Sequence, residues 1–199
     1  MSDRNKSKPA EIQPLEVVKY GHPALRSKGR RIESIDQSIV QLAQEMIETM
    51  YVEEGVGLAA QQVGRSLQLA VIDVMPAHEE RPSQAWVDGR EIEIESLMPL
   101  VLINPEIHPV GTKRELGTEG CLSIPGLQDE VDRSARVRVL CQELSGERIE
   151  FEAEGLLARA AQHEMDHLNG ILFIDHLPAE SLQEHQPLLQ KLQAKSLPF

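Results

Sequence analysis

Apolar side chains recur every three or four positions between residues 35 and 51, which predicts an amphipathic helix. Ser34 followed by Gln37 fits a capping box at the start of this helix, and Gly55 lies just beyond its end. The apolar face consists of Ile35, Ile39, Leu42, Met46 and Met50. One apolar face is typical of a helix that packs against a core, so we expect this helix to be structural.

Shorter apolar runs predict strands at residues 67–74 and 100–103, and a further short strand at 15–19. Residues 137–141 and 148–152 flank the turn signal Ser145-Gly146, so they predict a β-hairpin. Two more helices are expected towards the end of the chain. Residues 155–169 predict a helix that ends at Asn169-Gly170, and residues 179–195 predict a surface helix that Pro187 interrupts.

The remaining segments are less regular. Residues 1–14 are polar and predict a disordered lead-in. Residues 75–99 are rich in acidic residues and proline, and we interpret them as a long insertion with a ribbon at Ile92 and Ile94. Because strands and helices do not alternate, we expect an α+β fold that forms a single domain over residues 15–199.

Composition and charge argue against several classes of protein. The 20 basic residues against 32 acidic ones give a formal net charge of −12, which disfavours a sequence-independent nucleic-acid binder. No apolar run approaches the ~20 residues of a membrane helix. The two cysteines are too few for a disulfide scaffold, and residues 1–10 do not have the pattern of a secretory signal. We therefore expect a cytoplasmic protein with no specific nucleic-acid or membrane partner.

The strongest chemical signal is His163-Glu164-Met165-Asp166-His167. Histidines four positions apart lie on one helix face, about one turn from each other, where both imidazoles can bind one metal ion. The glutamate beside the first histidine can then act as general base on a water molecule at that metal. The alternative is a helix with two surface histidines.

A catalytic metal site usually has three protein ligands, so a third ligand is needed. In one class of metalloprotease it is a histidine six residues after the second one, but this chain has Phe173 there. Three carboxylates downstream, Asp175, Glu180 and Glu184, stand in no distinctive context. Upstream, Cys121 could supply a thiolate, although a free cysteine is just as often a small core residue.

A third segment, residues 55–62, combines two glycines with small side chains. Such a backbone allows close approach, so an extended peptide could pair with it by main-chain hydrogen bonds. A helix end followed by a turn would explain the same residues.

Taken together, these three segments resemble the peptide deformylases of bacteria and organelles. The family signature has a G-x-G-L-A-A-x-Q stretch, then E-G-C-L-S, then Q-H-E-x-D-H, and this chain has all three in that order at residues 55–62, 119–123 and 162–167. The resemblance implies antiparallel sheets around a central metal-binding helix. It also implies a catalytic domain that removes the formyl group from N-terminal formyl-methionine and releases formate.

The resemblance also implies roles for individual residues. The metal ligands would be Cys121, His163 and His167, and Glu164 would be the general acid and base. The Gln62 side chain and the Leu122 backbone N–H would donate hydrogen bonds to the formyl oxygen. Substrate backbone would be held at Gly57 and Gly120.

Helical spacing suggests the pocket for the methionine side chain. Leu156, Arg159 and Ala160 lie seven, four and three residues before His163, on or beside the face that carries the metal ligands. Leu156 and Ala160 would leave an apolar slot and Val56 would form another wall, although this face could also be ordinary core. We expect Arg159 to lay its stem along the rim with its head in water.

Glu119 precedes the cysteine, and we expect it to form an ion pair with Arg133 that orients the ligand loop. The family also supplies Fe(II), one ion per chain, as the working metal, with Zn, Ni or Co as substitutes. The ligand set alone would favour zinc. The implied partners are formyl-methionyl nascent peptides and, transiently, the ribosome.

The chain departs from the family pattern at Gln61, where proline is common, and at residues 126–129, which lack a basic residue. Two rival functions stay open on the residues alone. One is a zinc peptidase that uses a downstream carboxylate, and the other is a structural metal module, which should have four protein ligands.

Overall fold

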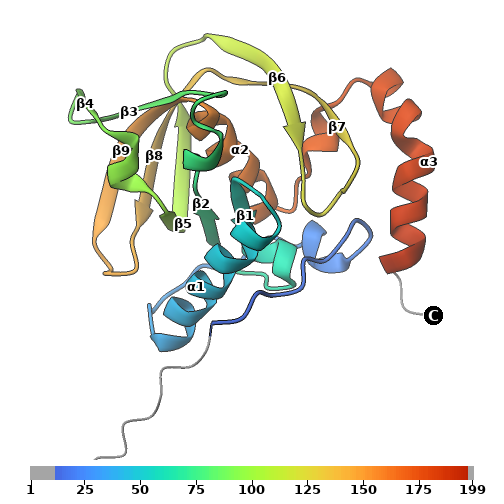
Figure 1. Ribbon diagram of the computed structural model, residues 1–199, viewed down its shortest axis with the longest axis horizontal. Coiled ribbons are helices and arrows are strands. Elements are labelled where there is room, and N and C mark those ends of the chain that lie inside the picture. Colours follow the sequence, from blue (N-terminus) through green and yellow to red (C-terminus); the bar gives the residue numbers. More distant parts are fainter. Residues whose placement is uncertain (1–11, 197–199) are drawn as a thin grey trace, which may run out of the picture.

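A seven-stranded antiparallel sheet and a two-stranded ribbon lie on either side of helix α2 (Leu156–Leu168) in the computed structural model, which describes residues 12–196 (Figure 1). The expected α+β fold is therefore confirmed. The sheet has the order β1 (Gly57–Ala59), β2 (Leu69–Ile72), β5 (Leu100–Pro109), β8 (Arg136–Gln142), β9 (Arg148–Gly155), β3 (Ser83–Val87) and β4 (Arg90–Ile92). The ribbon pairs β6 (Arg114–Gly120) with β7 (Gln128–Ser134).

Strand β2 is apolar throughout because both of its faces are covered. Leu69 and Val71 pack in one cluster with residues of helix α1 (Gln37–Val52), whereas Ala70 and Ile72 pack in another with residues of α2. A strand buried on both faces has a continuous apolar run, and this explains the pattern of residues 67–74. The sheet thus separates α1 from α2.

Helix α1 begins later than its apolar pattern predicts. Its N-cap is Asp36, whose side chain accepts hydrogen bonds from the backbone of Ser38 and Ile39. The capping box predicted at Ser34 is therefore wrong. A carboxylate placed directly before the first helical residue satisfies the free N–H groups of the first turn better than a hydroxyl two positions upstream.

Helix α2 starts immediately after β9, at a junction that requires glycine. Gly155 has φ +69°, and a Cβ at this position would lie 2.1 Å from the carbonyl oxygen of Pro82. The helix ends at Asn169, followed by Gly170 in the left-handed region, as predicted. The chain therefore turns sharply at both ends of the helix that carries the histidine motif.

Residues 75–99 are built onto the sheet. Strands β3 and β4 form a hairpin in which Ala85 pairs with Ile92, and β3 also pairs with β9. Ile94 is buried in a short 3-10 helix beyond the hairpin, so only part of the expected ribbon is strand. The guanidinium of Arg136 lies 3.9 Å from the ring centre of Trp86, which fixes the hairpin against β8.

The two ends of the described chain differ from prediction. Residues 15–19 are not a strand; the backbone of Val18 donates to the carbonyl of Gln62 instead. Of the predicted lead-in, residues 1–11 lie outside the described part, and residues 12–14 are exposed. Helix α3 (Ala179–Ser196) continues through Pro187 without a break.

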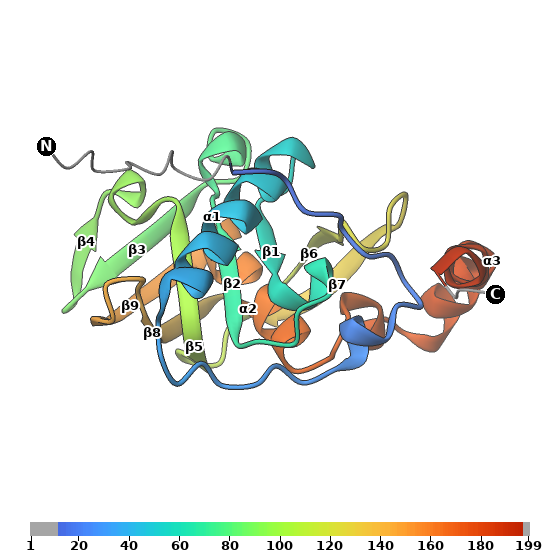
Figure 2. The same cartoon turned by 90° about the horizontal axis from the view of Figure 1, so that it is seen from below.

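Helix α3 lies at the opposite end of the molecule from the β3–β4 hairpin (Figure 2). Its Leu189 is buried in a cluster with Leu25, Ile124 and Val131, so it packs beside the ribbon. Within residues 12–196, no helix combines the length and the apolar character that crossing a bilayer requires.

Candidate metal centre and active site

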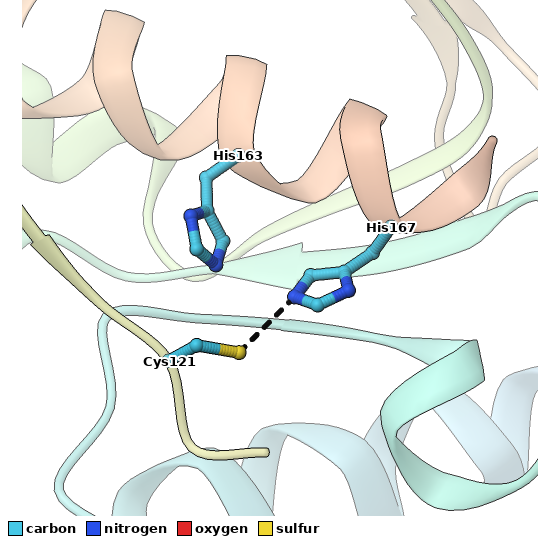
Figure 3. A group of neighbouring side chains, drawn as sticks. All are labelled: Cys121, His163 and His167. Atoms are coloured by element: carbon cyan, nitrogen blue, oxygen red, sulfur yellow. Dashed lines mark hydrogen bonds between the residues drawn. The ribbon is translucent and has the colours of Figure 1, made fainter. Parts of the chain in front are cut away.

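His163 and His167 project from the same side of α2 towards Cys121, which follows the last residue of β6 (Figure 3). The Cys121 Sγ and His167 Nε2 atoms are 3.3 Å apart, and one ligand atom from each of the three residues lies within 4.8 Å of the others. Both histidines are buried. The three residues therefore converge on one point although 42 positions separate the cysteine from the first histidine.

These three donors fit a single divalent metal ion. Typical metal–sulfur and metal–nitrogen distances of about 2.3 and 2.1 Å place two ligands of a tetrahedral ion about 3.6 Å apart, close to the observed separation of sulfur and nitrogen. One thiolate and two imidazoles leave the fourth position free, as catalytic sites do. Asp175, Glu180 and Glu184 are not part of this group, since Asp175 pairs with Arg26 and the two glutamates lie on α3.

Glu119 fixes the orientation of His163. Its Oε2 atom lies 3.0 Å from His163 Nδ1, so the other ring nitrogen, Nε2, is left to face the metal position. Arg133 binds the same carboxylate through two hydrogen bonds of 2.9 and 3.0 Å, which is the ion pair we expected. Burial alone would raise the pKa of Glu119, but the hydrogen bonds from His163 and Arg133 hold this pKa well below its usual range.

Glu164 is buried beside the same point, and Gly57 makes room for it. A Cβ at Gly57 would lie 2.3 Å from Glu164 Oε1. The other carboxylate oxygen, Oε2, has no hydrogen-bond partner among the described residues. Burial raises the pKa of Glu164 to about 7, with further repulsion from Glu119 and Asp166. A carboxyl group in this environment can both accept and return a proton near neutral pH.

Gln62 is held in one amide orientation. Its Oε1 atom accepts a hydrogen bond of 2.8 Å from the backbone of Ala59, so its NH₂ group faces the site, where Nε2 lies 3.5 Å from Cys121 Sγ. Leu122 follows the cysteine and is only partly buried. Both residues line a cavity of about 670 Å³. The other predicted site residues in its wall are Val56, Gly57, Glu119, Gly120, Cys121, Leu156, Arg159, Ala160, His163 and Glu164.

The expectation that Arg159 keeps its head in water is wrong. Its guanidinium points inward, between α2 and the ribbon, and donates to the Glu119 carboxylate and to backbone carbonyls of β6 and β7. Its side chain is 11% exposed. The physical reason is the ribbon itself, which supplies acceptors that the spacing of residues along α2 could not indicate.

Sequence reasoning missed several residues of the site. Asp166 accepts a 2.6 Å hydrogen bond from Arg133 and lies 2.7 Å from His176, so it extends the charge network behind the ligands. Arg81, from the segment predicted as an insertion, lines the cavity and donates to the carbonyl of Thr118. Only Asp166 had a signal in the sequence, because it lies within the histidine motif.

Comparison with known proteins agrees with this geometry. A family model described as polypeptide deformylase matches residues 14–183. A peptide deformylase of Methylacidiphilum infernorum is 48% identical over 178 residues, which is 89% of this chain and 92% of the relative, and one of Acinetobacter baumannii is 39% identical over 178 residues.

Solved structures agree as well. The crystal structure of the plant peptide deformylase PDF1B has a TM-score of 0.77 at 36% identity and covers 94% of both chains. A peptide deformylase from Synechococcus elongatus, solved in complex with actinonin, has a TM-score of 0.71 at 37% identity and covers 97% of this chain and 91% of its own. On the strength of the family match and the shared fold, the chain belongs to the polypeptide deformylase family.

Proposed function

We infer that the chain removes the formyl group from the N-terminal formyl-methionine of newly synthesised proteins and releases formate. The observation that carries this conclusion is the position of Glu164. Its carboxylate is buried against Gly57 and lines the same cavity as the ligand candidates Cys121 and His163. A proton acceptor beside three metal ligands is the arrangement of a metal-dependent hydrolase.

The residues of the chain divide the reaction between them. When bound, the metal supplies an acidified water molecule as the nucleophile. Glu164 accepts the proton from this water and returns it to the amine that leaves. The Gln62 amide and the Leu122 N–H donate hydrogen bonds to the formyl oxygen as negative charge develops on it. This assignment is supported by Gln62 Nε2, which lies 3.5 Å from Cys121 Sγ, and by Leu122, which follows the cysteine in the chain.

Two strand edges support a site for extended peptide. Among the described residues, β1 pairs with no strand except β2, and β6 pairs with no strand except β7, so each has a second edge that no other strand covers. Gly57 lies on β1 and Gly120 ends β6, and both line the cavity. We propose that the substrate backbone lies between these two positions, since main-chain pairing binds peptides with little regard to their side chains.

The methionine side chain would then occupy the apolar part of the cavity. Leu156 and Ala160 on α2 line this cavity, and Val56 lines it from the segment before β1. A flexible, unbranched side chain suits a slot of this kind.

We propose Fe(II) as the metal, with Zn, Ni or Co as substitutes. The mixed thiolate and imidazole ligands are compatible with each of these ions, and family resemblance favours iron. If iron is native, activity purified in air should decay, nickel or cobalt should restore stable activity, and zinc should restore much less. Equal activity with zinc, unaffected by air, would contradict the iron assignment alone.

We also propose that residues 15–199 form one catalytic domain that acts in the cytoplasm and visits the ribosome transiently. Both cysteines are free, which suits a reducing compartment. Binding to purified ribosomes that carry formylated nascent chains, compared with binding to empty ones, would test this contact.

The decisive experiment for the reaction uses formyl-Met-Ala-Ser. We expect formate and an intact free-amine peptide in equal amounts from the metal-loaded protein, and neither from the His163→Ala variant. Cleavage of a peptide bond would show a peptidase instead. The absence of both products at full metal occupancy would favour a structural metal module.

A further inference from the structure

Arg159 joins helix α2 to both strands of the ribbon. Its Nη1 atom donates to the carbonyl of Gly117 on β6 at 3.2 Å and to the carbonyl of Val131 on β7 at 2.7 Å. The same atom lies 2.9 Å from Glu119 Oε1, and Nη2 donates to the carbonyl of Glu115 at 2.8 Å. A single guanidinium therefore contacts four acceptors on two strands.

Gly117 provides the space for this guanidinium. A Cβ at Gly117 would lie 2.7 Å from Nη2 and 2.8 Å from Cζ of Arg159. Gly117 is not in the left-handed region of backbone conformation, so a turn does not explain the glycine. The close approach of Arg159 does explain it.

The ribbon depends on contacts of this kind. Within residues 12–196, strands β6 and β7 pair with each other and with no other strand, so the hydrogen bonds of the main sheet do not hold them in place. Cys121 follows directly after β6, whereas His163 and His167 lie on α2. The distance from the thiolate to the imidazoles therefore depends in part on the side chains that tie the ribbon to α2.

Other side chains also connect the ribbon to α2, but each of them contacts fewer residues of the ribbon. Gln162 bonds both backbone groups of Ser134, at the end of β7. Arg133 lies on β7 and donates hydrogen bonds to the side chains of Glu119 and Asp166. Among the described residues, Arg159 is the side chain of α2 that bonds backbone carbonyls of both strands.

We propose that Arg159 is a positioning residue of the metal centre: it fixes the ribbon, and with it Cys121 and Glu119, against α2, and so slows the loss of the metal. A planar guanidinium can serve four acceptors in fixed directions, and the compact ammonium of a lysine cannot. This role rests on the metal site of the proposed function but not on the formylated substrate.

The test compares three variants of the full-length protein loaded with Co(II). Arg159→Met keeps the length of the stem but removes the guanidinium, and Gly117→Ala keeps the arginine but displaces it. Arg114→Met is the matched control, because Arg114 bonds Asp132 across the same ribbon without reaching α2. The rate of Co(II) release to a chelator, the thiolate–cobalt absorption band and the thermal stability of the metal-free protein are measured for each.

We expect Arg159→Met and Gly117→Ala to release Co(II) faster than the parent, by up to the roughly 10–100-fold that losing an outer partner of a metal site costs in metal affinity. The cobalt band should shift or weaken in both, and Arg114→Met should match the parent within about twofold. Because both changes remove one contact, adding Gly117→Ala to Arg159→Met should have little further effect on release.

Two results would overturn the proposal. Unchanged metal release with unchanged stability would show that the contacts of Arg159 do not position the metal ligands. Unchanged release with lower stability of the metal-free protein would make its role purely structural. Metal release is measured without substrate, so failure here is distinguishable from failure of the proposed reaction. If Arg159→Met does not fold, Gly117→Ala still decides the question.

Discussion

His163 and Glu164 are neighbours in the chain, but their side chains differ in hydrogen bonding. The Nδ1 atom of His163 faces Glu119 at 3.0 Å, so its ring is held in one orientation. Glu164 Oε2 is buried without a partner among the described residues. A fixed ring suits a metal ligand, whereas an unpaired carboxylate is available for proton transfer. We therefore propose two different tasks for these adjacent positions on one helix.

Glu164→Gln should therefore separate chemistry from metal binding. The amide cannot accept a proton from water or return one to the amine, so kcat should fall by about 10²–10⁴ or more, with little change in KM. Metal content, measured by elemental analysis after desalting, should equal that of the parent. Loss of metal would mean that Glu164 is a ligand, and near-normal turnover would mean that another residue is the base.

Cys121→Ser should remove the metal. The hydroxyl of serine does not ionise as a thiol does, so it is a poor replacement for a thiolate ligand. We expect metal affinity to fall by more than the roughly 10–100-fold that losing a partner of a ligand costs. Asp175→Asn and Glu184→Gln serve as controls and should retain the metal. Full occupancy of the serine variant would exclude the cysteine as a ligand.

At the scale of elements, sequence patterns predicted most of the helices and strands that pack in the core. Helix α1 was predicted from its one apolar face, α2 from the end signal Asn169-Gly170, and the β8–β9 hairpin from its apolar runs and its turn. Strands β6 and β7 were missed because most of their side chains are exposed or polar, so no apolar alternation marks them. Strand β5 extends well beyond residues 100–103 for the same reason.

In the candidate site too, some residues could be predicted from the sequence and others could not. His163, Glu164 and His167 lie in one short motif, so they could be proposed from residue spacing, whereas Cys121 was assigned as a ligand only through the family resemblance. The inward direction of Arg159 could not, because it depends on carbonyls of the ribbon, which lies elsewhere in the sequence. Cys141 on β8 is buried in the core, and burial raises the pKa of its thiol to about 12.

The junction between β9 and α2 leads to a prediction at this scale. Gly155→Ala combines a backbone conformation that costs other residues about 1–3 kcal/mol with a Cβ only 2.1 Å from the Pro82 oxygen. Gly146→Ala is the matched control, because Gly146 has φ +86° but nothing within 4 Å of its Cβ position. Urea unfolding should show a loss of stability at least twice as large for Gly155→Ala. Equal losses would mean that the contact with Pro82 is relieved easily.

At the scale of the whole molecule, segments from both ends of the chain meet behind the metal centre. The backbone of Gly29 donates to the carbonyl of Leu168 at the end of α2, and Gly170 lies against the backbone of Arg26. Arg26 forms an ion pair with Asp175, in the short helix Phe173–His176 that follows α2. The ion pair between Arg26 and Asp175 joins two ionisable groups, so the stability of the fold should depend on pH.

The direction of this dependence follows from Asp175. Burial would raise the pKa of its carboxyl, but the hydrogen bond from Arg26 and another from the backbone of Leu172 lower it below its ordinary value near 3.8. A carboxyl group whose pKa is lower in the folded state stabilises the fold above its unfolded-state pKa, and this contribution is lost as the pH falls through its folded-state pKa.

Asp175→Asn should therefore destabilise the metal-free protein at pH 7, because the neutral amide cannot pair with Arg26 as a charge. As the pH falls below about 3.8, the parent should lose the same interaction and the two unfolding midpoints in urea should converge. Metal-free protein is compared because metal loss in acid would otherwise add its own pH dependence. A difference that stays constant from pH 7 to pH 3 would show that Asp175 acts through packing or neutral hydrogen bonds rather than through its charge.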